Sequence, residues 1–404
     1  MRRGAHSVWN RESHSSTSYA WSRSVRPIAA ALLVIVCGVA SPALAQTYSY
    51  WVGGDGVWQA SGGENWTDDT GVVFGSWQDN GIAVFDATPS GAVAVDRSVG
   101  TVSIVGMVFA RSGYIVNGDS IRLGGGADVP FDVASGVTAI VNSELTGSSK
   151  DLAFHKDGTG TLTLGGLSTY EGKTFVNAGR LNVLTGASLG NSTYTLIADG
   201  AELNNNGYVS NDVDVKGLLS GSGMVGGTVS AFPGGVISPG NGGAGILSIS
   251  GLVMENGGTL DMRIGKAARD ASPVAGVDYD SVASDGRVIF GFDSLGTLAL
   301  NFNPSTQVMQ TGDSYTLVSN TYGESMPTVG ELGFVTMNGA PMSLDGAGVF
   351  TWGEYMFQLS YTGSGGSLTG GNDVVLCVLD APIPEPATLG LLGLGGLVLI
   401  RRRR

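Results

Sequence analysis

The sequence predicts an all-β fold, a solenoid of stacked coils that ends in a β-sheet or sandwich-like cap. Three observations predict it. Gly accounts for 66 of the 404 residues, well above the roughly 7% of average proteins, and Gly supplies the positive φ that tight turns require. Short β-rich runs such as AVFDA and TVSIVGMVFA end at Gly, Asn or Asp. The body shows no 3.6-residue periodicity of an amphipathic helix.

Residues 1–45 have the pattern of a signal peptide. A basic, polar leader precedes 13 apolar residues, Ile28–Ala40, and Ala43 and Ala45 then form the Ala-x-Ala pattern that signal peptidase cleaves. The alternative is a membrane anchor, but 13 residues of helix span only about 20 Å, less than the roughly 30 Å of a bilayer core. We therefore expect a signal helix and cleavage after Ala45.

Residues 46–130 form a β region rich in Trp and Gly. Trp51, Trp58 and Trp66 are spaced so that they fall on separate strands or turns. We expect them to pack at the N-terminal end of the solenoid. The alternative is that the three rings form a ligand-stacking platform for sugars.

Residues 131–257 are expected to form the central coils, with the clearest unit at 158–207. Thr161, Leu162, Thr163 and Leu164 alternate as in a half-buried strand, and a turn is expected over 177–179. Strands and turns recur without helices, so each piece buries one narrow apolar face. Stacked coils can join these faces into one core, which is the principle of a solenoid.

The stretch GTGTLTLGGLSTYEGKTFVNAGRL (158–181) resembles the autotransporter-associated β-strand repeat, or passenger-associated transport repeat. The resemblance implies a right-handed parallel β-helix. It departs from the family pattern at Ser168, where Asn is usual. The matching positions are Gly158, Gly160, Leu162, Leu164, Thr169, Tyr170, Gly172, Asn177, Gly179 and Leu181.

Residues 258–380 contain longer alternating strands and are expected to form the C-terminal cap. Such a cap has a physical purpose, because an open solenoid end exposes unpaired strand edges that invite aggregation.

The residues that could carry chemistry are few. His155 is the only histidine of the predicted mature chain, stands in a turn-like context and has no Gly-x-Ser-x-Gly elbow with it. Zinc needs three or four suitable ligands, and Cys377 is expected to be a buried strand residue. We therefore expect no catalytic residues, no metal site and no cofactor.

The acidic residues are expected to lie in turns and at the surface. Asp278, Asp280 and Asp285 do not have the spacing of a calcium loop, although adventitious calcium is an alternative. The net charge is −13 while basic residues gather at both ends, so the body itself is strongly acidic. Such a body repels phosphate backbones, which argues against nucleic acid as a partner.

Residues 381–404 combine Pro384-Glu385-Pro386, the apolar run 387–400 and four terminal arginines, Arg401, Arg402, Arg403 and Arg404. The apolar run is expected to form a membrane helix whose arginines hold the cytoplasmic face. This order of elements resembles the PEP-CTERM sorting signal. The resemblance implies a Gram-negative bacterium and an exosortase that cuts near 384–386. It also implies a precursor held transiently in the inner membrane before transfer to the cell surface or extracellular matrix.

These observations favour an exported, non-catalytic structural or adhesive protein, with exopolysaccharide of a biofilm as a candidate partner. One alternative is a polysaccharide-active β-helix enzyme, a lyase or hydrolase, which rests on analogy of fold. Another is a lectin-like protein that binds carbohydrate through its tryptophans. A basic residue among clustered acids on a concave face would favour the enzyme, and a smooth polar face would favour the scaffold.

Overall fold

The computed structural model describes residues 46–382 except 72–73, 126–127, 241, 269–270, 292–295 and 323–327. The described residues form 34 β-strands and no helix, so the all-β prediction is confirmed. This part of the chain accordingly has no helix long and apolar enough to cross a membrane. The predicted signal helix in 1–45 and the predicted membrane helix in 387–400 lie outside the described residues.

The first of two sheets forms one face of a solenoid. Its strands pair in parallel with the strand one coil earlier and the strand one coil later, until β30 pairs with β31 in the antiparallel sense. Its strands are β2 (Gly56–Gln59), β6 (Ala92–Asp96), β8 (Ile115–Gly118), β11 (Thr138–Val141), β14 (Thr161–Leu164), β16 (Arg180–Val183), β18 (Glu202–Asn205), β21 (Leu218–Gly221), β23 (Val236–Pro239), β25 (Thr259–Arg263), β28 (Thr297–Asn301), β30 (Phe334–Met337) and β31 (Ala340–Met342).

The second sheet forms the two remaining faces of the coils. Long strands join these faces: β22 pairs with β19 through Met224 and Val225, and with β20 through 229–231. Its strands outside the C-terminal cap are β1 (Tyr48–Trp51), β3 (Trp66–Thr67), β4 (Phe74–Gly75), β5 (Gly81–Phe85), β7 (Ser103–Phe109), β9 (Ile121–Leu123), β10 (Asp128–Val133), β12 (Leu145–Thr146), β13 (Ala153–Asp157), β15 (Lys173–Val176), β17 (Tyr194–Ile197), β19 (Tyr208–Val209), β20 (Val213–Val215), β22 (Met224–Ala231), β24 (Ile246–Met254), β26 (Ser281–Ser284) and β27 (Val288–Phe290).

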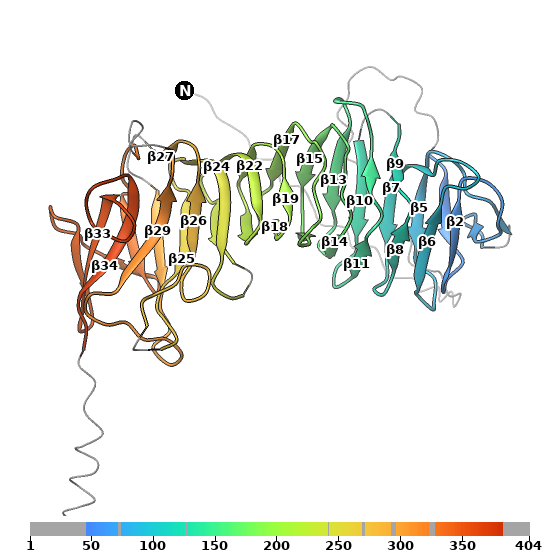
Figure 1. Cartoon of the computed structure of the whole chain (residues 1–404). Coiled ribbons are helices and arrows are strands. Elements are labelled where there is room, and N and C mark those ends of the chain that lie inside the picture. Colours follow the sequence, from blue (N-terminus) through green and yellow to red (C-terminus); the bar gives the residue numbers. More distant parts are fainter. Residues whose placement is uncertain are drawn as a thin grey trace, which may run out of the picture. The chain divides into compact units, whose positions relative to one another are not determined.

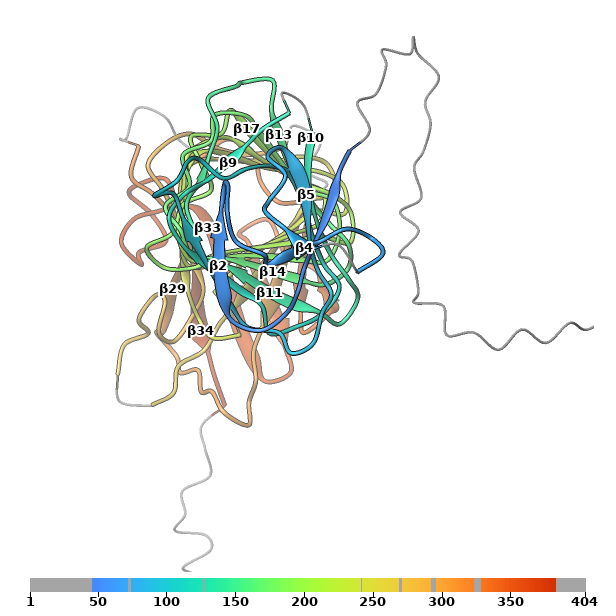
Figure 2. The same cartoon turned by 90° about the vertical axis from the view of Figure 1, so that its right-hand side faces the viewer.

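The core runs through the interior of the solenoid, because each strand turns alternate side chains inward. Figure 1 shows the strands following one another along one axis in chain order, and Figure 2 shows them surrounding a common interior. Parallel pairing in register places like side chains above one another in successive coils. One such column on the first sheet consists of Ala139, Leu162, Leu181, Leu203, Leu219, Ile237, Leu260, Leu298 and Val335, all buried.

Glycine makes the corner of the predicted repeat. The turn expected over 177–179 lies between β15 and β16, and Gly179 has a φ of +62°. A Cβ atom at this position would lie 2.4 Å from the carbonyl oxygen of Gly160 in the preceding coil. A side chain is therefore excluded twice, by backbone conformation and by the close approach of the neighbouring coil.

The C-terminal cap is expected over residues 258–380, and the sense of strand pairing changes within this range rather than at residue 258. Parallel pairing continues beyond it, from β25 to β28 and on to β30. Antiparallel pairing closes the end through β29 (Ser314–Asn320), β32 (Val349–Trp352), β33 (Tyr355–Gly363) and β34 (Asp373–Asp380). Strands β25 and β28 keep the alternation of buried and less buried side chains that earlier coils show. The connections between successive strands are longer after residue 258.

Candidate functional surfaces

The structure brings the three predicted tryptophans together inside the first coils. Trp51, Trp58 and Trp66 are 1%, 0% and 3% exposed, and the Trp66 ring centroid lies 5.1 Å from that of Trp51 and 5.0 Å from that of Trp58. Trp77 and Phe85, which sequence reasoning missed, complete the cluster. Rings that are buried against one another have no face open to a sugar. The tryptophans instead form the hydrophobic core at the N-terminal end of the solenoid.

His155 lies in strand β13, not in the turn expected from the sequence. Its Nε2 atom is 3.2 Å from Oδ1 of Asp128, its Nδ1 atom is 3.0 Å from Nδ2 of Asn177, and its ring stacks on Phe175 with 4.9 Å between centroids. The Asn177 amide nitrogen can only donate, so Nδ1 accepts and Nε2 carries the proton that is donated to Asp128. Both ring nitrogens are thus engaged, and neither contact is with a serine.

The partners of His155 lie one coil away on either side, which explains why sequence reasoning missed them. Asp128 begins β10 of the preceding coil, and Asn177 follows β15 of the next. An acid and an amide separated from the histidine by more than 20 residues form no local motif. If the length of one coil were known, the partners could be found by counting that many residues forward and backward from His155.

Lys156 is buried next to His155 and ties two coils together. Its Nζ atom donates to the carbonyl oxygens of Asp157, Gly158 and Ala178 at 2.9, 2.8 and 3.0 Å. Burial lowers the pKa of this amine to about 8, while the carboxylates of Asp157 and Asp132 act in the opposite direction. The amine lies in the interior with its three hydrogen bonds made, so the arrangement is that of a structural tie between turns.

The acidic segment 278–285 supports the backbone. Asp280, expected in a turn or at the surface, is 2% exposed and accepts hydrogen bonds from the amides of Gly245 and Arg263 at 3.0 and 2.7 Å. Burial is the main cause that raises its pKa to about 6. Asp278 accepts from the amides of Ala267 and Val274, so both carboxylates hold main-chain groups.

No cluster of ligands for a metal ion is present in the described ranges, where no three His, Cys, Asp or Glu side chains converge. Cys377 lies in β34 and is half-buried, where the sequence led us to expect full burial. Its Sγ atom is 3.5 Å from Oγ of Ser314.

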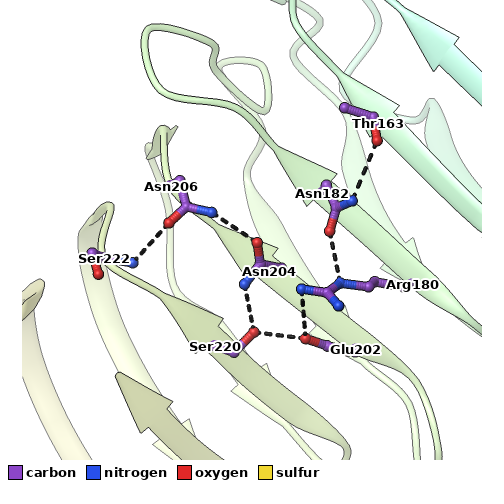
Figure 3. A network of polar contacts seen from close by, with 8 residues as sticks. All are labelled: Thr163, Arg180, Asn182, Glu202, Asn204, Asn206, Ser220 and Ser222. Carbon is purple, nitrogen blue, oxygen red and sulfur yellow. Dashed lines mark hydrogen bonds and ion pairs between the residues drawn. The ribbon is translucent and has the colours of Figure 1, made fainter. Parts of the chain in front are cut away.

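A row of polar side chains crosses the outer face of the first sheet (Figure 3). Thr163, Asn182, Asn204 and Ser220 occupy the same register position on β14, β16, β18 and β21. Asn182 donates to Thr163 at 3.3 Å, and Asn204 donates to Ser220 at 2.8 Å. We call these four residues the polar row.

Charged and amide side chains connect the polar row on both sides. Arg180 donates through Nε to Oδ1 of Asn182 at 2.8 Å and forms an ion pair of 3.4 Å with Glu202. Glu202 accepts from Ser220 at 2.7 Å, and Asn206 donates to Asn204 at 2.7 Å. Figure 3 shows the result, a network whose polar groups are largely directed at one another across coils. Such a network can hold the register of the coils.

Comparison with known proteins identifies two segments of the chain. Residues 154–183 match the passenger-associated-transport-repeat family, and residues 382–404 match the PEP-CTERM protein-sorting motif. A similar protein is the adhesin BmaC autotransporter of Brucella suis biovar 1 (strain 1330), which is 38% identical over 183 residues. The match covers 41% of this chain and 5% of the relative, so the chain spans only a small part of that protein's length.

The repeat match contains β14, β15 and β16 together with His155, Lys156 and Arg180. The sorting motif lies almost entirely outside the described residues and is known from the sequence alone. Both resemblances noted in the sequence are confirmed: the chain carries a passenger-associated transport repeat within its solenoid and a PEP-CTERM protein-sorting motif over residues 382–404.

Proposed function

We propose that the protein is an exported, exosortase-sorted structural or adhesive protein of the cell surface or extracellular matrix, without catalytic activity. One observation carries the proposal: a solenoid whose outer polar side chains bond to one another across coils is followed by a PEP-CTERM motif. The similarity to a protein named an adhesin supports the adhesive role.

The proposed route uses both ends of the chain. Signal peptidase removes residues 1–45 after the Ala43-x-Ala45 pattern, and the C-terminal segment then holds the precursor in the inner membrane. Exosortase recognises Pro384-Glu385-Pro386 and passes the body outward, with exopolysaccharide of a biofilm as the matrix partner. Arg401, Arg402, Arg403 and Arg404 keep the end of the chain on the cytoplasmic side.

A polysaccharide lyase or hydrolase has less support. His155 is bonded to an acid and an amide, and Lys156 among its neighbouring acids is buried with three carbonyl partners. The Lys156 amine is therefore not presented to a substrate, and both ring nitrogens of His155 are already engaged.

The full chain, produced in a Gram-negative host with and without an exosortase, tests the proposal. With the exosortase, the body should become accessible to protease added to intact cells, and these cells should adhere to polysaccharide-coated surfaces better than cells without the chain. A body that stays inside the cell in both hosts contradicts the export. Depolymerisation of polysaccharide by the purified full chain contradicts the non-catalytic role.

A further inference from the structure

A pocket of about 310 Å³ lies where the solenoid passes into its cap. Three chain segments form its walls: the loop at Ser272–Pro273, the turn and strand start over Gly312–Thr316, and the turn at Gly365–Gly366. Tyr279 forms the remaining wall and is itself 5% exposed. Three segments that are far apart in the sequence therefore line one pocket.

Hydrogen bonds hold the three walls of this pocket together. Lys266 donates through Nζ to the carbonyl oxygen of Ala271 at 2.8 Å and to Oδ1 of Asp313 at 2.5 Å, which joins the first wall to the second. Ser314 donates through Oγ to the carbonyl oxygen of Gly366, which joins the second wall to the third. A pocket whose walls are tied in this way is preorganised, so a ligand need not order them on binding.

The lining combines neutralised charge with hydroxyl groups. Asp313 and Lys266 are 7% and 3% exposed, and their opposite charges neutralise each other. The Asp313 carboxylate accepts from the Lys266 amine and from the Gln310 amide, and its remaining lone pairs can accept further hydrogen bonds. The hydroxyl of Tyr279 accepts from the amide of Thr316 at 3.3 Å, so its own hydrogen can donate. Pro273 and the ring of Tyr279 add apolar surface.

We propose that this pocket binds one neutral sugar unit of a glycan, an assignment that rests on the proposed adhesive function. A sugar presents adjacent hydroxyls, which act as donors and acceptors at once, beside apolar C–H faces. The pocket offers the matching set of a carboxylate, hydroxyls, glycine peptide groups and two apolar surfaces. Its volume is at the lower end of the roughly 300–1,000 Å³ range of small-molecule sites, which suits a single ring.

The test uses the purified full chain in mild detergent with methyl glucoside, methyl galactoside and methyl mannoside as probes. Saturation-transfer NMR should show transfer to at least one of them. Ser272→Trp fills the mouth from an exposed loop position and should weaken binding at least about tenfold. Val277→Trp is the matched control, because Val277 belongs to the same loop, is 74% exposed and does not line the pocket.

Two further measurements make the test specific. Thr316→Val keeps the shape but removes one hydroxyl and should weaken binding about threefold to tenfold. Methyl glucuronide should bind more weakly than methyl glucoside, because its carboxylate loses hydration in a pocket whose lining residues include no Lys or Arg to pair with it. No transfer from any neutral probe, or equal weakening by Ser272→Trp and Val277→Trp, overturns the assignment. Since binding is measured on purified protein, failure here leaves the export result of the proposed function untouched.

Discussion

At Asp280 two opposing forces act on a single carboxylate. Burial disfavours the ionised form, whereas the amides of Gly245 and Arg263 donate to it and favour that form. Burial prevails and raises the pKa to about 6 from an ordinary value of 3.8. The folded state therefore binds this proton more tightly than the unfolded state, and the contribution to stability is largest in acid.

The first prediction concerns pH. The stability that Asp280 contributes is present below about pH 4 and is lost as pH rises through about 6, because only the unfolded chain is ionised in that window. Between pH 4 and 7, the free energy of unfolding of the wild type should fall by up to about 3 kcal/mol relative to Asp280→Asn. Urea unfolding across this range measures it. The exposed control Asp285→Asn should follow the wild-type profile, and a flat difference for Asp280→Asn would contradict the assignment.

The second prediction concerns His155. Because its nitrogens contact Asp128 and Asn177, His155→Ala should leave any measured turnover of acidic or neutral polysaccharides unchanged. The variant loses two surface hydrogen bonds and the stacking on Phe175, at a cost of about 1–2 kcal/mol in stability. Activity assays and urea unfolding are run together. A large loss of turnover with an unchanged unfolding curve would show that His155 is catalytic.

At the scale of the strand, parallel pairing in register determines which polar side chains of successive coils lie next to one another. In-register pairing sets Asn182, Asn204 and Ser220 side by side on successive coils, and within this row Asn204 donates to Ser220. Asn204 is 1% exposed, and a buried amide must find partners within the protein. The Arg180–Glu202 ion pair beside it is partly exposed, with side chains 35% and 24% accessible, and is screened by solvent.

The third prediction ranks two substitutions in this network. Asn204→Ala removes two side-chain hydrogen bonds, a buried one with Ser220 and a partly buried one with Asn206, and should lower the free energy of unfolding by about 1–3 kcal/mol. Arg180→Ala removes a partly exposed ion pair with Glu202 and a partly exposed hydrogen bond to Asn182, and should cost about 1 kcal/mol or less. Urea unfolding of both variants in one buffer gives the comparison, and the reverse order would mean that the ion pair holds the coils together.

At the scale of the whole molecule, two separable forces are expected to act on the C-terminal segment. Burial of its apolar side chains in the bilayer contributes on the order of 1.5–3 kcal/mol each. The four arginines oppose passage, since each costs roughly 2.5–3.5 kcal/mol at the bilayer centre on insertion scales. Recognition by the exosortase is expected to depend on a third element, Pro384-Glu385-Pro386, which the sorting-motif match includes.

The fourth prediction separates retention from recognition. Replacing 384–386 by three alanines should leave membrane insertion intact but block processing, so that uncut precursor accumulates. Replacing 401–404 by neutral residues should instead weaken retention of the precursor in the membrane, so that the C-terminal segment is translocated. Fractionation and intact mass in an exosortase-carrying host provide the readout. Release of the triple-alanine variant as efficient as that of the wild type would mean that the segment is a plain anchor.

Local patterns explain how much of the fold could be predicted. The strand over Thr161–Leu164 and the turn ending at Gly179 depend on neighbours in sequence, and both occur as predicted, except that Thr163 is buried along with the two leucines. The expected boundary at residue 258 rests on longer alternating strands, and strand length by itself does not alter the parallel pairing of β25 with β28. Whether a strand continues a solenoid depends on the coil beneath it.

The sequence by itself determined the β class, the repeat and the C-terminal sorting motif, because each is encoded in contiguous residues. Only the tertiary structure decided that Trp51, Trp58 and Trp66 are buried, that Asp128 and Asn177 bracket His155, and that three distant segments enclose a pocket. The physical reason is that contacts in a solenoid join residues one coil apart. Because coil length varies along the chain, the partner of a side chain cannot be located until the coils are stacked.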